Sequence, residues 1–544
     1  MVAIRGAGDL TEAGNARIVC ETRMSGTKEV SSAPRSRAAF VLESPELIRW
    51  LELLLTAVVV IASLVPLARF VQVALLRIGY PFDLEWCEGG ILGHIQVILA
   101  GQHIYREPSL EFTPDIYPPL YYYVSALPSL LFGAGHFAPR LVSLLSILGC
   151  FVLLGRWVRD ETDDPVAGLA AVGLLCATYQ LTGYWFELAR VDAFFLLLVF
   201  SSQMTARRAH KPAHAVFAGV LIAAAIFTKQ LGIPLAIPAL LLLALRSPRL
   251  ALIAAGVSGA LVLGVALYFN ISTHGWFLYY VLDLPSRHQV QLTRFWPSLN
   301  TFFLSTTFPM TLAGVALVCG LAFRRRRWQS WLFHTVFVTV TCTTSFLPFL
   351  KDGGYPNGLI PAYAALALAA GIGLGTLRRA RVGSALGSLG PQLAACIVLL
   401  IQFAVLDYEP KQALPSKADL AANKQVMARL STLQKPLYFT GSSFYSRTAG
   451  GENVITDSMA LIDIFKGGGP QAEHLDQVLS EAILQHRFKT IVVDRVVGFL
   501  PPKYVALIHQ EYVQQGSVLS GLPSDAIWPK SGAALRPDGV WVAR

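Results

Sequence analysis

Three carboxylates lie close together directly after the first apolar segment of the chain. Asp83, Glu85 and Glu88 all fall within the sequence FDLEWCEGG, residues 82–90. Carboxylates are costly near hydrocarbon, so acids retained at the edge of a membrane are candidates for function. A carboxylate in this position can accept a proton from a hydroxyl or an amine, which is general-base chemistry. We therefore expect this stretch to hold a catalytic base.

Cations and further polar side chains occur in later loops that separate apolar segments. Arg190 stands in FELARVDAF and Lys229 stands in FTKQLG. Arg and Lys donate charge-assisted hydrogen bonds to phosphate, so acids facing these bases predict a site for an anionic headgroup beside a proton acceptor. The predicted donor-phosphate or substrate-binding residues are Tyr117, Arg190, Asp192, Lys229, Arg287 and His288.

Each of these residues also has a purely structural interpretation. Arg190 and Asp192 could form an ion pair that only supports the fold. Lys229 could be an ordinary loop lysine, and Tyr117 could belong to an aromatic belt at the membrane interface. The sequence leaves these alternatives open.

The composition identifies the elements that must position these side chains. Of the 544 residues, 54% are hydrophobic and only 14% are charged, whereas soluble domains carry about 25% charged residues. This composition predicts a polytopic membrane protein. The net charge of +10 does not indicate nucleic-acid binding, because the basic residues form short clusters between apolar segments. The seven cysteines form no CxxC pair, so we expect neither a zinc site nor a disulfide framework.

The apolar segments predict about eleven transmembrane helices, the first from Leu51 to about Val71. Segment 116–139 is interrupted by prolines, and the positive-inside rule is satisfied when it lies in the interface. Segments 88–101 and 117–134 are then predicted to be amphipathic helices along the outer surface. This topology places residues 1–49 inside as a disordered cytoplasmic tail, and it places the acids outside.

The composition changes at Asp407, which separates a membrane domain of residues 50–406 from a small soluble α/β domain of residues 407–544. Strands are predicted at 436–440, 453–456, 490–494 and 539–543, and helices at 415–430, 471–486 and 502–514. The predicted fold is therefore an all-α polytopic membrane domain followed by an extracytoplasmic α/β domain.

Several short motifs, in this order and spacing, resemble those of one enzyme group. GQHIY (101–105), PPLYYY (118–123), PRLVS (139–143), ARVDA (189–193) and FTKQ (227–230) follow the acids. The pattern resembles the GT-C membrane glycosyltransferases, and in particular the branch that includes protein O-mannosyltransferases and lipid A aminoarabinose transferases. This resemblance implies a polyprenyl-phosphate-sugar donor, an extracytoplasmic site and inverting transfer with an acid as base.

The chain departs from the family pattern at two positions. Cys87-Glu88 occupies the place of the family's Asp-Glu pair, which favours Glu88 as the base and leaves Asp83 and Glu85 as alternatives. Tyr117 stands where relatives often have Lys, so phosphate binding is expected to rest on Lys229.

We therefore expect an integral glycosyltransferase of the bacterial inner membrane that acts on a glycan, lipid or protein acceptor. The sequence identifies no cofactor with certainty, and a divalent metal is possible but is not indicated by the sequence. The alternatives are a transporter or flippase for lipid-linked saccharides and a non-catalytic membrane scaffold.

Overall fold

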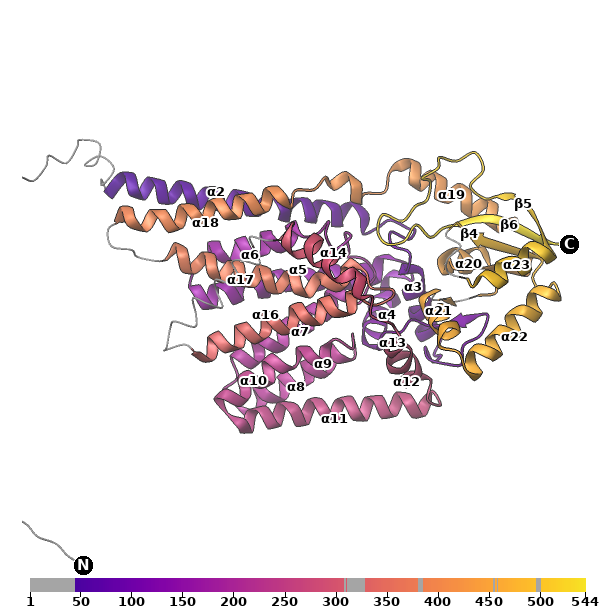
Figure 1. The fold of residues 1–544 in the computed structure, drawn as a ribbon, viewed down its shortest axis with the longest axis horizontal. Helices are drawn as coiled ribbons and strands as arrows, with labels where there is room; N and C mark the ends of the chain where they lie inside the picture. The colour runs from indigo at the N-terminus through magenta and orange to yellow at the C-terminus, as the bar shows by residue number, and fades with distance from the viewer. Residues whose placement is uncertain are drawn as a thin grey trace, which may run out of the picture.

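The computed structural model describes residues 45–307, 310, 328–379, 385–453, 455–456, 458–495 and 500–544. Long helices form a bundle at one end, and an α/β domain caps the other end (Figure 1). The predicted tail up to residue 44 and the basic run Arg324–Arg327 lie outside the described residues. The described helices of the bundle are α2 Pro45–Arg77, α5 Phe137–Thr162, α6 Pro165–Ala177, α7 Asp192–Arg207, α8 Pro212–Ile226, α9 Gly232–Leu235, α10 Ile237–Arg246, α11 Pro248–Ser272, α16 Trp328–Phe349, α17 Ile360–Arg378 and α18 Ala385–Val405.

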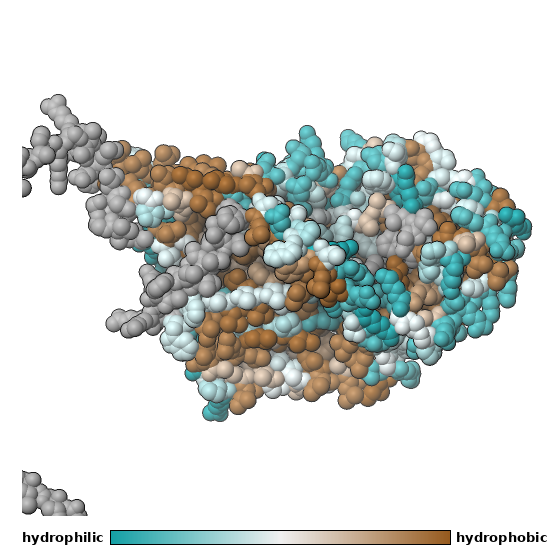
Figure 2. All heavy atoms as spheres, in the orientation of Figure 1, coloured by the Kyte–Doolittle hydropathy of each residue, from teal (hydrophilic) through white to brown (hydrophobic). Residues whose placement is uncertain are grey.

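Five of these helices are long and apolar enough to cross a membrane, namely those at Glu46–Arg77, Phe137–Thr162, Pro248–Ser272, Trp328–Phe349 and Pro356–Arg378. A bent pair, Leu389–Val405 with Pro410–Ser431, would make a sixth span. Shorter apolar helices lie between them, and the described residues of the bundle are largely hydrophobic on the face shown in Figure 2. The chain is thus an integral membrane protein, and the number eleven stays a prediction. The first helix is longer than expected, since it begins at Pro45 and ends at Arg77.

Small residues let the central helices approach closely. A Cβ atom added at Gly168 of α6 would lie 2.6 Å from the carbonyl oxygen of Gly155 in α5, and one at Gly371 of α17 would lie 2.7 Å from the side chain of Ala171. Helices in a bilayer associate through such close contacts, because lipid removes the hydrophobic driving force between them. Helix α6 also has a defined start, where the Asp164 side chain accepts hydrogen bonds from the backbone N–H groups of Val166 and Ala167.

Two helices predicted on the outer surface are present as α3 Glu88–Leu99 and α4 Leu120–Phe132. Helix α4 has buried Tyr121 and Tyr122 and exposed Leu130 and Leu131, as an interfacial helix should. The expected amphipathic character of α3 is wrong, since this helix is buried along most of its length. The cause is the C-terminal domain, whose residues Phe444, Arg447 and Ile455 pack against Gly89 and Gly93 of α3.

The connections after α11 and around α16 to α19 consist of short turns. They are α12 Trp276–Leu278, η1 Tyr279–Asp283, α13 Leu284–Ser286, η2 Leu292–Arg294, α14 Phe295–Leu299, η3 Asn300–Leu304, η5 Pro356–Leu359 and η6 Pro410–Ala413.

The C-terminal domain contains a four-stranded sheet in the order β2-β4-β6-β5. Strands β2 and β4 are parallel, and β6 is antiparallel to both β4 and β5. Its strands are β2 Leu437–Phe439, β4 Thr490–Asp494, β5 Tyr512–Ser517 and β6 Pro537–Ala543. Its helices are α19 Lys417–Ser431, α20 Ser443–Ala449, α21 Ser458–Gly467, α22 Pro470–Leu484 and α23 Pro502–Glu511. The helix predicted at 502–514 ends early, because Tyr512 begins β5.

The predicted strand at 453–456 does not join this sheet. It forms the short strand β3 Ile455–Thr456, which pairs in parallel with β1 Phe112–Thr113 from the loop after α3. The C-terminal domain is therefore joined to the membrane part by backbone hydrogen bonds as well as by the chain itself.

Candidate active site

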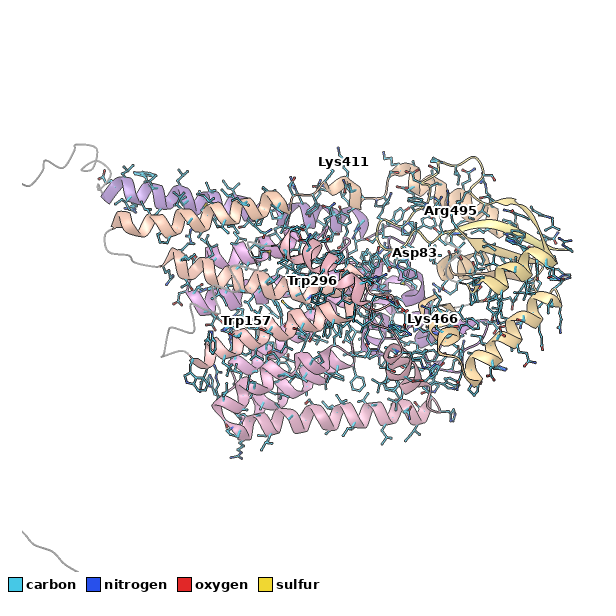
Figure 3. The ribbon with its side chains drawn as sticks, in the orientation of Figure 1. Asp83, Trp157, Trp296, Lys411, Lys466 and Arg495 are labelled. Carbon is cyan, nitrogen blue, oxygen red and sulfur yellow. The ribbon has the colours of Figure 1, made fainter. Side chains whose placement is uncertain are left out.

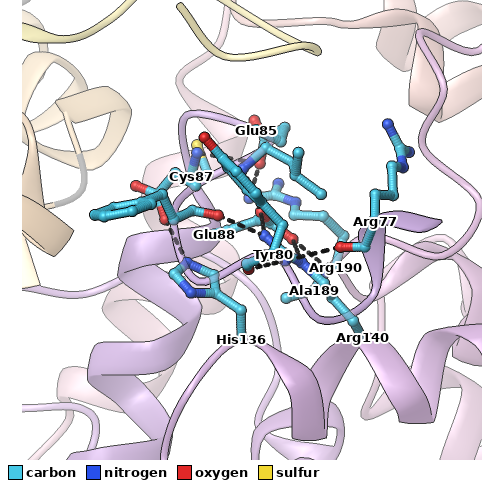
Figure 4. Close-up of polar contacts among 12 residues, drawn as sticks. Arg77, Tyr80, Glu85, Cys87, Glu88, His136, Arg140, Ala189 and Arg190 are labelled. Atoms are coloured by element: carbon cyan, nitrogen blue, oxygen red, sulfur yellow. Dashed lines mark hydrogen bonds and ion pairs between the residues drawn. The ribbon is translucent and has the colours of Figure 1, made fainter. Parts of the chain in front are cut away.

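The three acids lie where the helical bundle meets the C-terminal domain (Figures 3 and 4). Asp83 and Glu85 are in the loop between α2 and α3, and Glu88 is the first residue of α3. Figure 4 shows that Arg140 of α5 and Arg190, just before α7, approach this loop from the bundle. The bundle thus holds fixed cations beneath a short run of carboxylates.

Glu88 is held on all sides by hydrogen-bond donors. Its two oxygens accept from Nε and Nη2 of Arg140 at 2.8 and 2.6 Å. The backbone N–H groups of Leu84 and Ala189 donate to them at 2.8 and 2.9 Å. Burial alone would raise the pKa of Glu88, but Arg140 and these donors lower it to about 2. Glu88 therefore remains charged and has little capacity left to accept a further proton.

Glu85 is equally buried but much less satisfied. Its Oε2 accepts from the N–H of Cys87 at 3.0 Å and lies 3.8 Å from Nη1 of Arg190, while its Oε1 has no hydrogen-bond partner. Burial raises the pKa of Glu85 to about 8, although Arg190 opposes this shift. The side chain is covered by the C-terminal domain, where Ser531 forms a parallel bridge to Glu85.

Asp83 is the most accessible of the three, with 10% of its side chain exposed. His136, which precedes α5, places its Nε2 atom 2.7 Å from Oδ1 of Asp83. Burial raises the pKa of Asp83, and the contact with His136 partly offsets that rise. Asp83 also borders a small gap formed with Ser442 and Tyr445 of the C-terminal domain.

Four of the predicted phosphate-site residues come together beside Glu85. The guanidinium of Arg190 lies 5.7 Å from the centre of the Tyr117 ring, and Nζ of Lys229 lies at the same distance from that ring. Lys229 also donates to Asp192 at 2.7 Å, and Asn357 donates to the other oxygen of Asp192. Asp192 therefore forms an ion pair with Lys229, whereas the expected partner Arg190 lies 3.8 Å from Glu85, and the two cations converge on the ring of Tyr117.

Of these four residues, Arg190 has side-chain donor atoms that make no hydrogen bond. It is only 6% exposed, and its Nε and Nη1 atoms make no hydrogen bond. Leaving buried donors of a charged group unsatisfied costs more than about 1–3 kcal/mol. Such donors fit an anion with several acceptor oxygens, as a phosphate has.

Arg287 and His288 do not join this group. Arg287 pairs with Asp283 at 2.7 Å, and His288 contacts Asp463 of α21. The contact of His288 with Asp463 holds the loop after α11 against the C-terminal domain, whereas the pair of Arg287 with Asp283 lies within that loop. Their prediction as phosphate ligands is therefore not supported by their geometry.

Sequence reasoning missed the partners that fix the acids, namely His136 and Arg140. Arg140 lies in the PRLVS motif, so an arginine in a motif that follows three acids was the available signal. A second buried pair, Arg77 with Glu187 at 2.5 Å, fixes the end of α2 in the same way.

Asp83, Glu88 and His136 also place one ligand atom each within 4.8 Å of one another, as a metal site would. Both oxygens of Glu88 are already engaged by four donors, however. These residues therefore fit a metal ion poorly while those hydrogen bonds persist.

Comparisons with known proteins now bear on this geometry. Residues 117–276 match the model of the family described as dolichyl-phosphate-mannose-protein mannosyltransferase. Crystal structures of ArnT from Cupriavidus metallidurans share the fold with a TM-score of 0.51. The undecaprenyl-phosphate complex is 14% identical and covers 87% of this chain and 97% of that one. The apo structure is 15% identical and covers 88% and 97%. The resemblance to the GT-C superfamily is confirmed.

The family match covers part of the GT-C membrane domain and includes Tyr117, Arg140, Arg190 and Lys229. It ends before the C-terminal domain. A comparison with curated proteins found no match. The likeness to ArnT therefore establishes the GT-C fold, and the chemistry has to be argued from the site.

Proposed function

We propose that this protein is a membrane glycosyltransferase that moves a sugar from a polyprenyl-phosphate carrier to an extracytoplasmic acceptor. We call residues 78–88, which connect α2 to α3 and include Asp83, Glu85 and Glu88, the acid loop. The observation that carries the proposal is the buried Arg190, whose Nε and Nη1 atoms make no hydrogen bond and which lies beside Glu85 of this loop. One neighbouring structure, that of ArnT, contains undecaprenyl phosphate, which agrees with a lipid phosphate as the anion. A lipid-phosphate leaving group needs no nucleotide site.

The cations would bind the phosphate of the donor. Arg190 supplies two donor nitrogens, Nε and Nη1, that make no hydrogen bond, and Lys229 adds positive charge nearby while Asp192 keeps it oriented. As the bond to the sugar breaks, negative charge grows on the phosphate oxygens, and fixed cations stabilise that charge without reorganising.

Asp83 is the acid best placed to act as the general base, because its side chain is the most accessible of the three. The oxygen or nitrogen of the acceptor attacks C1 of the sugar from the face opposite the phosphate, so the configuration at C1 inverts. The bond from C1 to the phosphate oxygen breaks, its electron pair leaves with the lipid phosphate, and the acceptor's proton passes to Asp83. The sequence favoured Glu88, but its four hydrogen bonds favour a supporting role.

The decisive experiment is a transfer assay with purified protein and polyprenyl-phosphate sugars, analysed by mass spectrometry. Transfer to a glycan, lipid or protein fraction would support the proposal. Movement of intact lipid-linked sugar across proteoliposomes without transfer would instead favour the transporter interpretation.

Replacing Arg190 by Gln is expected to weaken donor binding more than it lowers the maximal rate. A hydrogen bond to a charged group contributes roughly 1.5–3 kcal/mol, so the apparent KM for the donor should rise about tenfold to a hundredfold. The control is Arg208→Gln, because Arg208 pairs with Asp160 at the other end of α7. Equal donor KM values for the two variants would remove Arg190 from the phosphate site.

We also propose that the C-terminal domain lies outside the bacterial inner membrane and that the α7–α8 connection lies inside. With the native cysteines replaced, Val513→Cys should react with an impermeant maleimide in intact spheroplasts, because Val513 is exposed on β5. Cysteine at exposed His210 should react only after permeabilisation. The reverse pattern would contradict the eleven-helix topology.

A further inference from the structure

A cavity of about 450 Å³ lies between the acid loop and helix α20 of the C-terminal domain. Binding sites for small ligands typically measure about 300–1,000 Å³, so this cavity can hold a small organic molecule. Its lining combines aromatic rings with hydrogen-bonding side chains. The side chains that line it include Tyr80, Gln96, His136, Phe137, Phe444 and Arg447.

The cavity adjoins the acid proposed as the base. His136 lines the cavity and also holds Asp83 through its Nε2 atom at 2.7 Å. Arg190, by contrast, contacts Glu85. The two candidate ligand positions therefore involve different acids, with the cavity on the side of Asp83 and the phosphate-binding cations on the side of Glu85.

Arg447 gives the cavity a positive charge from the C-terminal domain. Its guanidinium packs against α3, because a Cβ atom added at Gly93 would lie 2.9 Å from its Nη1 atom. Burial lowers the pKa of Arg447 to about 10, and Asp83 opposes that shift. Arg447 therefore places a guanidinium at the lining of the cavity, close enough to Asp83 for the two charges to interact.

The other lining groups suit a sugar. Tyr80, Phe137 and Phe444 offer aromatic surface to the C–H faces of a ring, while the Gln96 amide can hydrogen-bond hydroxyl groups. The planar guanidinium of Arg447 matches a carboxylate or a phosphate in geometry. Mixed apolar and polar linings of this kind orient a ligand as well as bind it.

We propose that this cavity is the acceptor subsite and that the acceptor is a saccharide carrying a carboxylate or phosphate group, which Arg447 binds. The inference rests on the proposed glycosyltransferase function and adds the chemical class of the acceptor. It also assigns the C-terminal domain a direct part in binding the acceptor.

The test measures binding of three monosaccharide probes to the purified full-length protein by saturation-transfer NMR. The probes are glucose, glucuronate and glucose 6-phosphate, so that the neutral ring, the carboxylate and the phosphate are compared. We expect one or both charged probes to bind at least about tenfold more tightly than glucose, and the stronger one identifies the anionic group. Arg447→Gln should abolish that preference.

Two further variants keep the result interpretable. Thr448→Trp places a large ring in the cavity from an exposed position on α20 and should block all three probes. Arg487→Gln, which removes an exposed arginine paired with Glu111, should change nothing. A charged-probe preference that survives Arg447→Gln, binding that survives Thr448→Trp, or no binding of any probe would each overturn the proposal.

Binding of undecaprenyl phosphate to the same preparations is measured separately. Its loss in Arg190→Gln tests the donor site independently of the acceptor cavity.

Discussion

Asp83→Asn is expected to lower kcat by about 10²–10⁴-fold while the protein stays folded and still binds the lipid phosphate. General-base catalysis typically contributes a factor of this size, and the amide is nearly isosteric with the acid but cannot take a proton. His136 and the small gap beside Asp83 should tolerate the change, because the hydrogen bond to His136 can persist. Single-turnover rates and donor binding, measured on the same preparation, separate the two effects.

The dependence of the wild-type rate on pH provides a second measure. The base must be deprotonated, so kcat/KM should rise with pH through a pKa above the ordinary aspartate value, because burial raises the pKa of Asp83.

Glu85→Gln is the comparison variant for Asp83→Asn. A full rate in Asp83→Asn together with a dead Glu85→Gln would transfer the base role to Glu85. Full activity in both would show that the acid loop is not the catalytic centre.

Arg140→Met is expected to destabilise the protein strongly, whatever its effect on catalysis. Removing one partner of a buried ion pair leaves the other charge uncompensated, which costs about 3–5 kcal/mol. Glu88 would lose two of its four donors, and the carbonyl groups of Tyr80 and Phe82 would lose theirs. The thermal unfolding midpoint in detergent should therefore fall well below that of Asp83→Asn.

The double variant Glu88→Gln/Arg140→Met tests the cause of that loss. It removes both charges, so its unfolding midpoint should recover part of what Arg140→Met loses. A double variant no more stable than Arg140→Met would mean that packing, and not the ion pair, dominates at this position.

The same ion pair makes the stability depend on pH. The folded pKa of Glu88, about 2, lies below its ordinary value of 4.5, so the stabilising contribution of Glu88 is complete above pH 4.5 and is lost as the pH falls toward 2.

The local elements were largely predictable from the sequence because their signals are local. Apolar runs marked the membrane helices, and β-branched runs such as 490–494 marked the central strand β4. The exceptions depend on tertiary contacts. Helix α3 is apolar enough to lie at a membrane interface. It is buried instead because α20, which comes much later in the chain, packs against it. Strand β5 follows α23 without a break because it pairs with β6.

The candidate site was predictable in its parts but not in its pairings. The acids, Arg190 and Lys229 could be found because charged residues are rare beside apolar segments. Which cation faces which acid depends on how the helices pack, so Arg140 and His136 were not assigned to Glu88 and Asp83. Arg287 and His288 were grouped with the others because they lie on the same predicted side of the membrane. In the structure Arg287 pairs with Asp283 of its own loop, and His288 contacts Asp463.

The contact between Ser531 and the acid loop affects the order in which the protein matures. The N–H of Ser531 donates to the carbonyl oxygen of Leu84 at 3.0 Å, and a Cβ atom added at the neighbouring Gly532, where φ is +80°, would lie 2.2 Å from the Trp86 ring. The acid loop leaves the ribosome well before the segment that covers it. Domains fold broadly in the order of synthesis, so we expect the membrane helices to assemble around an uncovered loop. The candidate site is then completed only after the segment around Ser531 has docked on the acid loop, and a nascent chain would remain inactive until that moment.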